Sequence, residues 1–297
     1  MYDDILLPFD GSDGASDALE HVADVASWCD ATVHVLYVAD TNRDSVTVVG
    51  GRAVDSLLTH GEEAVDEARA TLTSRGVAHE GEVVQGGPAR TIVDYAERYG
   101  LDLIAMPTNG RKGLSRRILG SVTEKVVRLS SVPVLAVRMA EDERLSFPYE
   151  DVLVPTDGST RAAAAADHGV ALAATVGARV HALSVVDDSL LGGLGLEDDP
   201  EADGDAEVEA AATNAVEDVV ADAEAAGVRD ATASVVRGDP AEEIRAHVEA
   251  TDVDAVVMGT TGRRGTERIL LGSVAERTVR TAPVPVLTVG EDADGAE

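Results

Sequence analysis

The sequence predicts an α/β protein made of two tandem domains, each a doubly wound, parallel sheet of five strands between helices. Three observations lead to this fold class. The chain has 297 residues, which fits two domains of about 150 residues each. Apolar residues make up 44% of it and aromatic residues only 3%, so Val, Leu, Ile and Ala must fill the interior, as in buried parallel sheets. The third observation is an internal repeat.

Segments of the first half recur in the same order in the second half. Residues 4–12 recur as 151–159, 34–38 as 181–185, 83–89 as 235–241, 118–122 as 270–274, and 132–135 as 284–287. The offset changes only from 147 to 152 residues, which one insertion in the second copy explains. We expect the boundary near residues 144–148, with one domain over 1–144 and the other over 149–290.

Short apolar runs alternate with longer amphipathic runs in each copy. In the first copy the strands are expected at 4–9, 32–38, 80–85, 102–106 and 133–137, and the helices at 14–28, 53–74, 89–98 and 121–129. This alternation predicts a parallel sheet with crossover helices. Gly76 and Gly100 follow helices where a left-handed C-cap is expected, and Gly177 and Gly227 take similar places in the second copy. The Gly-rich, acidic segment 187–206 is the expected mobile loop.

The chain is strongly acidic. It has 55 Asp and Glu residues against 24 Lys and Arg residues, for a net charge of −31. Such a surface repels itself in dilute buffer and is screened by salt, which favours a halophilic, high-salt cytoplasm. The same charge argues against a nucleic-acid partner, which would require a basic face.

The sequence also indicates a compartment. Its single cysteine, Cys29, excludes an intrachain disulfide and fits a reducing environment. The N-terminus lacks the basic start and apolar run of a signal peptide, and no apolar stretch reaches about 18 residues. We therefore expect a soluble cytoplasmic protein without membrane insertion.

The most informative segment lies between the fourth strand and the last helix of each copy. In the second copy it contains Gly259, two residues, Gly262, nine residues, and then Gly272 and Ser273. In a doubly wound sheet, ligands bind beyond the carboxyl ends of the strands, where the strand order reverses. Glycines at that edge let backbone N–H groups approach a phosphate closely. The segment therefore predicts an anion site.

The serine that opens each last helix allows two interpretations. A helix N-terminus offers free N–H groups and a favourable dipole to an anion. The stretches 121–124 and 273–276 also fit the Ser-x-x-Glu capping box, in which the serine hydroxyl has a purely structural task. Spacing alone does not separate phosphate contact from capping, and the two can coexist.

The basic residues gather around the same segments. Residues 111–128 and 263–280 together hold 11 of the 24 basic residues but only 3 of the 55 acidic ones. An acidic chain with this distribution is built to receive an anion. In the competing interpretation, the arginines form salt bridges to acidic helices of the other copy.

Together these residues resemble the universal stress protein family. The glycine pattern of the second copy is similar to that family's ATP-binding motif, and the Pro-x-Asp-Gly-Ser ends of the first strands are similar too. The resemblance covers nearly the whole chain as two tandem copies. It implies a strand order of 3-2-1-4-5 and pairing of the copies as a pseudo-dimer through their last strands. The implied ligand is ATP, or AMP or ADP, with or without Mg.

The resemblance also implies the site residues. In the second copy, Asp157 and Val185 would hold the adenosine, and the glycines and Ser273 would hold the phosphates. The full set there is Pro155, Thr156, Asp157, Val185, Met258, Gly259, Gly262, Arg263, Gly272, Ser273 and Val274. The weaker set in the first copy is Pro8, Asp10, Val38, Met106, Gly110, Arg111, Gly120, Ser121 and Val122.

The first copy departs from the pattern at Pro107, which stands where the second copy has Gly259. Proline has no N–H group and fixes φ near −65°, so a phosphate contact or a positive φ is lost there. We therefore expect the second copy to bind nucleotide more tightly.

Other candidate residues carry less weight. Asp10 and Asp157 end their strands at the ligand edge, which favours a site role, although an aspartate that caps the next helix is the alternative. His34 and His181 recur in register at the starts of the second strands, far from the glycine segments, and are expected to be surface or packing residues. The spacing of the seven histidines and one cysteine indicates no metal site.

Three functions remain. The first is a nucleotide-dependent stress-response regulator or binding module, in which ATP changes a surface for an unidentified protein partner or for further homo-dimerisation. The second is a slow ATPase or nucleotidyl-transfer enzyme, although only Asp10 and Asp157 could act as base or metal ligand. The third is a nucleotide-free scaffold. Co-purified nucleotide separates the third from the others, and product formed from Mg-ATP separates the second from the first.

Overall fold

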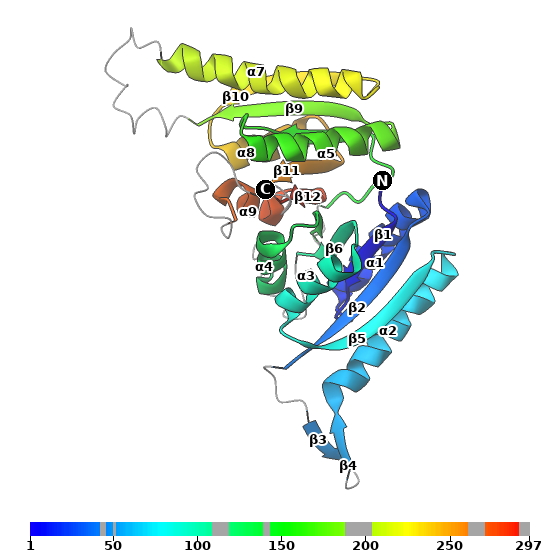
Figure 1. The fold of residues 1–297 in the computed structure, drawn as a ribbon. Coiled ribbons are helices and arrows are strands. Elements are labelled where there is room, and N and C mark those ends of the chain that lie inside the picture. Colours follow the sequence, from blue (N-terminus) through cyan, green and yellow to red (C-terminus); the bar gives the residue numbers. More distant parts are fainter. Residues whose placement is uncertain are drawn as a thin grey trace. The chain divides into compact units, whose positions relative to one another are not determined.

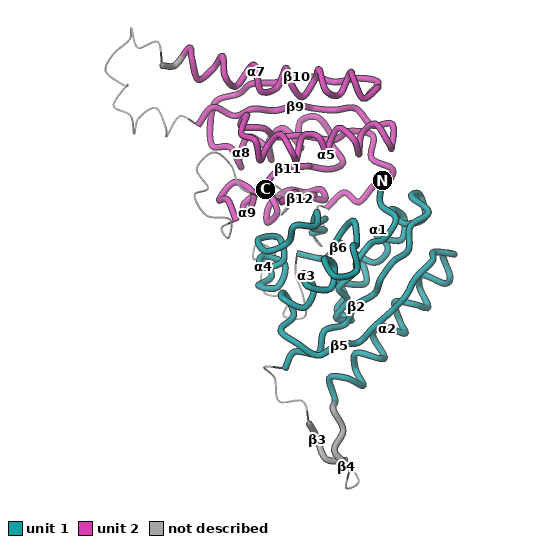
Figure 2. The backbone as a smooth tube through the Cα atoms, in the orientation of Figure 1, with its two compact units in different colours: residues 1–141, 292–297 teal, residues 142–291 magenta. Residues whose placement is uncertain are grey.

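A computed structural model describes residues 1–41, 46–49, 52–108, 119–138, 143–187, 204–260 and 271–290, with backbone alone for 46–49, 52–55 and 204–205. The chain divides into two compact units (Figure 2). Unit 1 comprises residues 1–141 and 292–297, and unit 2 comprises residues 142–291. The pairing of the two copies as a pseudo-dimer stays a prediction.

Unit 1 contains a parallel sheet whose strand order is β5-β2-β1-β6-β7, which is 3-2-1-4-5 when only these five are counted. Figure 1 labels β5, β2, β1 and β6 of this sheet. The strands are β1 (Asp4–Pro8), β2 (Thr32–Asp40), β5 (His79–Gly86), β6 (Leu103–Pro107) and β7 (Val134–Val137). The helices are α1 (Asp13–Cys29), α2 (Ser56–Ser74), α3 (Pro88–Tyr99) and α4 (Ser121–Leu129). The predicted fold class and strand order are confirmed for this unit.

Unit 2 repeats this architecture with the strand order β10-β9-β8-β11-β12. Its strands are β8 (Asp151–Pro155), β9 (Arg179–Val186), β10 (Ala231–Arg237), β11 (Ala255–Gly259) and β12 (Val286–Val289). Its helices are α5 (Thr160–Val176), α7 (Gly204–Ala225), α8 (Pro240–Ala250) and α9 (Ser273–Thr281). The prediction of two copies of one fold is therefore confirmed.

Unit 1 also has a feature that the sequence analysis missed. An antiparallel hairpin of β3 (Val46–Val49) and β4 (Arg52–Asp55) forms a separate two-stranded sheet. The helix expected to begin at residue 53 begins at Ser56 instead, because residues 52–55 pair as a strand. The predicted mobile loop 187–206 lies mostly outside the described residues. Its last part differs from the prediction, since α7 begins at Gly204.

The core follows the apolar runs of the sequence. β1 and β8 are buried along nearly their whole length, and Ile5, Leu6 and Leu153 are fully enclosed. Helices α1 and α5 begin at matching serines, because Ser12 Oγ accepts from Ala15 N at 3.3 Å and Ser159 Oγ from Ala162 N at 3.2 Å.

The predicted glycine C-caps are confirmed. Gly100 ends α3 with φ +64° and Gly177 ends α5 with φ +78°, and Gly76 and Gly227 also have positive φ values. Glycine occupies this left-handed region without the steric cost of a Cβ atom.

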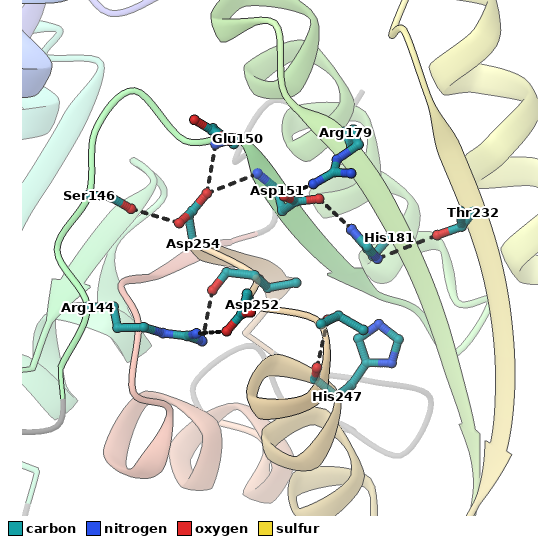
Figure 3. A network of polar contacts seen from close by, with 12 residues as sticks. Arg144, Ser146, Glu150, Asp151, Arg179, His181, Thr232, His247, Asp252 and Asp254 are labelled. Atoms are coloured by element: carbon teal, nitrogen blue, oxygen red, sulfur yellow. Dashed lines mark hydrogen bonds and ion pairs between the residues drawn. The ribbon is translucent and has the colours of Figure 1, made fainter.

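The recurring histidines lie at the amino ends of the strands, where they pair with recurring aspartates. His34 Nε2 lies 2.7 Å from Asp4 Oδ1, and His181 Nε2 lies 2.7 Å from Asp151 Oδ1 (Figure 3). Arg179 also binds the buried Asp151 carboxylate. Burial opposes ionisation of Asp151, but the hydrogen bonds from Arg179 and His181 outweigh it and lower its pKa. These histidines therefore have a structural task far from the glycine segments.

A second recurring aspartate ties the fourth strand to the first. Asp102 Oδ2 accepts from Asp3 N and Asp4 N at 2.8 and 3.0 Å. In unit 2, Asp254 Oδ2 accepts from Glu150 N and Asp151 N at 2.7 and 3.1 Å (Figure 3). Each carboxylate thus satisfies two N–H groups that the sheet ladder leaves open at its amino end.

The segment expected to join the two domains is fastened to unit 2. Arg144 Nη1 donates to Asp252 Oδ1 at 2.7 Å and its Nη2 to Val248 O at 2.9 Å, while Ser146 Oγ donates to Asp254 Oδ1 at 2.7 Å (Figure 3).

None of the helices in the described ranges is both long enough and apolar enough to cross a membrane.

Candidate nucleotide site

The strand order places the candidate site in each unit. In unit 2, β8 lies between β9 and β11 and all three run parallel, so their carboxyl ends meet at one edge of the sheet. The chain leaves β8 towards β9 on one side, and β11 on the other side continues to β12. This reversal next to β8 is the switch point at which doubly wound sheets open a crevice.

The loop after β8 is held in a tight shape by its own side chains. Asp157 Oδ1 accepts from Ser159 N at 3.0 Å, and Thr156 Oγ1 accepts from Gly158 N at 3.1 Å. Gly158 has φ +72°, which a residue with a Cβ rarely adopts. The N-cap of α5 is Ser159 and not Asp157. The alternative reading of Asp157 as a helix cap is therefore wrong, and the aspartate shapes the loop beside the crevice.

The loop after β1 repeats this geometry in unit 1. Asp10 Oδ1 accepts from Ser12 N at 3.1 Å and from Ser12 Oγ at 2.6 Å, and Gly11 has φ +72°. Ser12 is the N-cap of α1, so Asp10 is no helix cap either. Both aspartates lie half-buried at the carboxyl edge, just beyond the ends of β1 and β8.

The last helix of each unit starts against the end of the fourth strand. Gly272 N donates to Thr260 O at 2.8 Å, and Gly120 N donates to Thr108 O at 2.7 Å. Both glycines are the N-caps, with extended backbone, and the serines that follow are the first helical residues. A capping box needs the serine at the N-cap, so that interpretation of Ser121 and Ser273 is wrong.

This arrangement leaves the first helical turns without a cap side chain, because glycine has none. Ser121 and Ser273 are exposed, and Val122 and Val274 are half-buried. The N–H groups of such a turn are donors without intrahelical acceptors, and the helix dipole favours an anion beside them. The helix starts can therefore offer a phosphate the contacts that the sequence predicted.

A difference between the units lies next to this turn. Thr123 Oγ1 donates to the Pro107 carbonyl at 2.8 Å and anchors the first turn of α4 to the end of β6. In unit 2, Ala275 stands at the position of Thr123 and Gly259 at that of Pro107. The sequence analysis missed Thr123. Comparing the two copies residue by residue could have shown that Ala275 replaces Thr123, but not that the Thr123 hydroxyl meets the Pro107 carbonyl.

The remaining predicted residues lie in three places. Pro8, Pro155 and Thr156 lie at the ends of β1 and β8, Val38 and Val185 lie half-buried near the ends of β2 and β9, and Met106 and Met258 lie buried at the ends of β6 and β11. These groups share the carboxyl edge of their own unit. Gly110, Arg111, Gly262 and Arg263 lie outside the described residues.

The described arginines of segment 263–280 pair within unit 2. Arg277 Nη1 donates to Asp239 Oδ2 at 2.6 Å, which lowers the pKa of that carboxyl, and Arg280 Nη1 lies 3.4 Å from Glu276 Oε1. Asp239 caps α8, so Arg277 ties α9 to α8. Arg277 therefore serves helix packing, and Arg280 pairs within α9.

Comparisons with known proteins decide the family. The sequence matches the universal stress protein family over residues 1–138 and 148–290. The chain belongs to this family. It is 41% identical over 146 residues to universal stress protein MJ0531 of Methanocaldococcus jannaschii, a match that covers 48% of this chain and 86% of the relative. It is 29% identical over 148 residues to universal stress protein YxiE of Bacillus subtilis, covering 46% of this chain and all of that protein.

Solved structures give the same fold over the full length. A universal stress protein from Archaeoglobus fulgidus superposes with a TM-score of 0.72 at 24% identity, covering 98% of this chain and 97% of the other. A functionally unknown protein of Pseudomonas aeruginosa superposes with a TM-score of 0.67 at 18% identity, covering 98% and 93%. This universal stress protein is therefore a tandem, two-domain member, as its repeat predicted.

Proposed function

We propose that this universal stress protein binds an adenine nucleotide, ATP in the first place, chiefly in unit 2, and that occupancy regulates its binding to a protein partner. The observation that carries the proposal is the start of α9. Gly272 is the N-cap of α9 and has no side chain. Its N–H donates to Thr260 O at 2.8 Å, and Thr260 directly follows β11. A phosphate at this turn would receive backbone N–H groups and the favourable end of the helix dipole.

The adenosine would lie across the switch point beside this turn. Asp157, fixed by its bond to Ser159 N, lies at the end of β8, Val185 near the end of the neighbouring β9, and Met258 at the end of β11 on the other side. Apolar side chains with one convergent carboxylate form a suitable surface for a base and a ribose hydroxyl.

Unit 1 is proposed as the weaker site. Pro107 has no N–H to offer where unit 2 has Gly259. Its carbonyl is bound by Thr123 Oγ1, so the strand end and the first turn of α4 are tied together without a ligand. Unit 2 has Ala275 there and lacks this tie. The cytoplasmic location and the adaptation to high salt stay predictions from composition.

The direct test counts the nucleotide released when purified protein is denatured, with its identity read by mass spectrometry. The proposal expects an adenine nucleotide at up to one per chain. Titration calorimetry with ATP then separates the units. Gly262→Ala should weaken the affinity of the tighter site at least tenfold. Gly110→Ala should change the affinity of the weaker site alone.

A matched gain-of-function variant sharpens this test. Pro107→Gly restores the glycine of the motif to unit 1 and should tighten its site towards that of unit 2. Equal losses from the two glycine variants would contradict the asymmetry. The absence of any nucleotide binding by the wild-type chain in low or high salt would contradict the proposal itself. ADP formed from Mg-ATP by the wild-type chain, and lost in Asp157→Asn, would favour the ATPase alternative.

A further inference from the structure

Two histidine rings of unit 2 meet near the amino end of β9. His181 of β9 and His247 of α8 have ring centroids 5.8 Å apart and lie edge to face at 73° (Figure 3). The side chain of His181 is only 16% exposed. His247 is half-buried, and its Nε2 atom is buried. Solvent therefore screens a charge on either ring poorly.

The two rings differ in how they accommodate a proton. His181 Nε2 lies 2.7 Å from Asp151 Oδ1, so a proton on His181 meets a carboxylate. His247 Nε2 has no hydrogen-bond partner among the described residues. Burial lowers the pKa of His247, and the charge of His181 lowers it further. The pair therefore accepts one proton readily, and a second proton destabilises it.

The other charged groups on the surrounding elements are paired with one another or lie at the far end of α8. The ion pairs are Asp151–Arg179, Arg245–Glu249, Arg277–Asp239, Arg280–Glu276 and Arg144–Asp252. Glu242 and Glu243 stand in the first turn of α8, whereas His247 stands in its last turn. β10 contributes the neutral Thr232, whose Oγ1 lies 3.5 Å from His181 Nδ1. His181 is thus the charged neighbour that lowers the pKa of His247.

Unit 1 places a tyrosine where unit 2 has the second histidine. Counted from the prolines that open α3 and α8, Tyr95 takes the position of His247. Burial raises the pKa of Tyr95 to about 12, so it stays neutral at any pH near 7. Glu80 also lies 3.9 Å from His34 Nδ1, and in the matching register β10 has Thr232. The first copy thus has a carboxylate and a tyrosine where the second has a hydroxyl and a second histidine.

The second histidine stands where the segment 143–150 is fastened to unit 2. The carbonyl of His247 accepts from Thr251 N and Oγ1 at 3.0 and 2.7 Å, which ends α8. The next carbonyl, that of Val248, accepts from Arg144 Nη2 at 2.9 Å, and Arg144 Nη1 donates to Asp252 Oδ1 at 2.7 Å (Figure 3). Displacing the last turn of α8 would therefore also break the contacts of Arg144.

We propose that His181 and His247 form an acid-sensitive latch, which holds the last turn of α8 and the segment 143–150 in place while at most one of the two rings carries a proton. A second proton would put two imidazolium rings 5.8 Å apart in a partly buried place. Their repulsion favours a state in which the last turn of α8 leaves β9.

The direction of the pH dependence follows from linkage. In the open state His247 is solvated and regains the ordinary histidine pKa of about 6.5, whereas in the closed state its pKa is lower. The latch is therefore closed above about pH 6.5 and loosens as the pH falls towards the pKa of the closed state. Because opening takes up one proton, the open fraction rises by at most about tenfold per pH unit.

The test is backbone hydrogen exchange of the full chain from about pH 7.5 to 5 in constant KCl, read by mass spectrometry and corrected for the intrinsic pH dependence of exchange. In peptides covering 244–252 and 143–150, the opening equilibrium should rise together, by about tenfold over this range. The peptide covering 88–99, which contains Tyr95, is the internal reference and should show no such rise.

Two variants isolate the second proton. His247→Gln keeps a polar side chain of similar size that does not titrate, so the rise in peptide 244–252 should disappear. His60→Gln removes an exposed histidine of unit 1 and is the matched control, which should behave like the wild type.

Proton NMR measures the latch directly in the wild-type chain. The ring signal of His247, assigned by its loss in His247→Gln, should titrate below pH 6.5 and move towards that value in His181→Gln. A wild-type opening equilibrium that stays flat with pH, an equal rise in His247→Gln, or an ordinary pKa of His247 in the wild type overturns the proposal. A segment 143–150 that stays closed while 244–252 opens overturns it as well.

Discussion

His21 offers a sharp test of how burial controls the stability of unit 1. It lies on α1 with only 3% of its surface exposed. Burial disfavours the charged imidazolium and lowers the pKa from 6.5 to about 4, although Asp24 opposes this shift. The unfolded chain therefore takes up a proton before the folded chain does. The free energy of unfolding should fall as the pH drops from about 6.5 towards 4.

The magnitude follows from linkage. A full shift of this size corresponds to about 3 kcal/mol, and by pH 5 about 2 kcal/mol of it should be lost. The measurement stops at pH 5 because the chain would precipitate at its isoelectric point of about 4.4. The carboxylates also titrate, so the quantity to compare is the difference in unfolding free energy between the wild-type chain and His21→Leu.

The chain provides its own local probe for this measurement. Trp28 is the only tryptophan and lies near the end of α1. Urea unfolding in constant KCl, followed by its fluorescence, therefore reports unit 1. Between pH 7.5 and 5, the advantage of the wild type over His21→Leu should fall by about 2 kcal/mol. A difference that stays constant across this range would refute the reasoning that His21 is kept neutral by burial.

Three further predictions follow from single contacts. Asp254→Ala should destabilise unit 2 by about 2 kcal/mol in calorimetry, because two backbone N–H groups lose their acceptor. Asp102→Ala should destabilise unit 1 by the same amount. No loss of stability in either variant would contradict the role of the recurring aspartate. Gly120→Ala should destabilise unit 1 by about 1–2 kcal/mol more than Gly87→Ala. Its new Cβ would lie 2.9 Å from Thr108 O, whereas the Cβ at the other N-cap glycine meets nothing within 4 Å. In a salt series, refolding yield should rise with KCl as the net charge of −31 is screened, and full stability in dilute buffer would count against a halophilic origin.

The internal repeat carries more information than either copy alone. The repeat predicted two domains and the order of their elements, because buried parallel strands require continuous apolar runs and crossovers require helices of fixed minimum length. It also showed Pro107 in place of Gly259. The same comparison, once the strand register was known, exposed the difference between Glu80 and Thr232 on the outer strands.

The family resemblance implied the strand order, and the sequence by itself determined the fold class, the glycine C-caps and the segments that open the last helices. These are set by local periodicity and by residues whose backbone preferences are intrinsic, as for Gly100 at φ +64°. The choice between phosphate contact and capping at Ser121 could not be made in this way. It depends on whether Gly120 or Ser121 is the N-cap, and so on the residue at which the backbone becomes helical.

Only the tertiary structure decided which polar groups meet. His34 pairs with Asp4, which is 30 residues away in the sequence, and Thr123 donates to the carbonyl of Pro107, which is 16 residues away. The hairpin of β3 and β4 replaces the expected start of a helix. Such contacts depend on strand register and on the packing of a helix end against a strand end, which the pattern of nearby residues does not encode. The physical reason is that hydrogen bonds between distant segments form only where the fold has already brought their partners within reach.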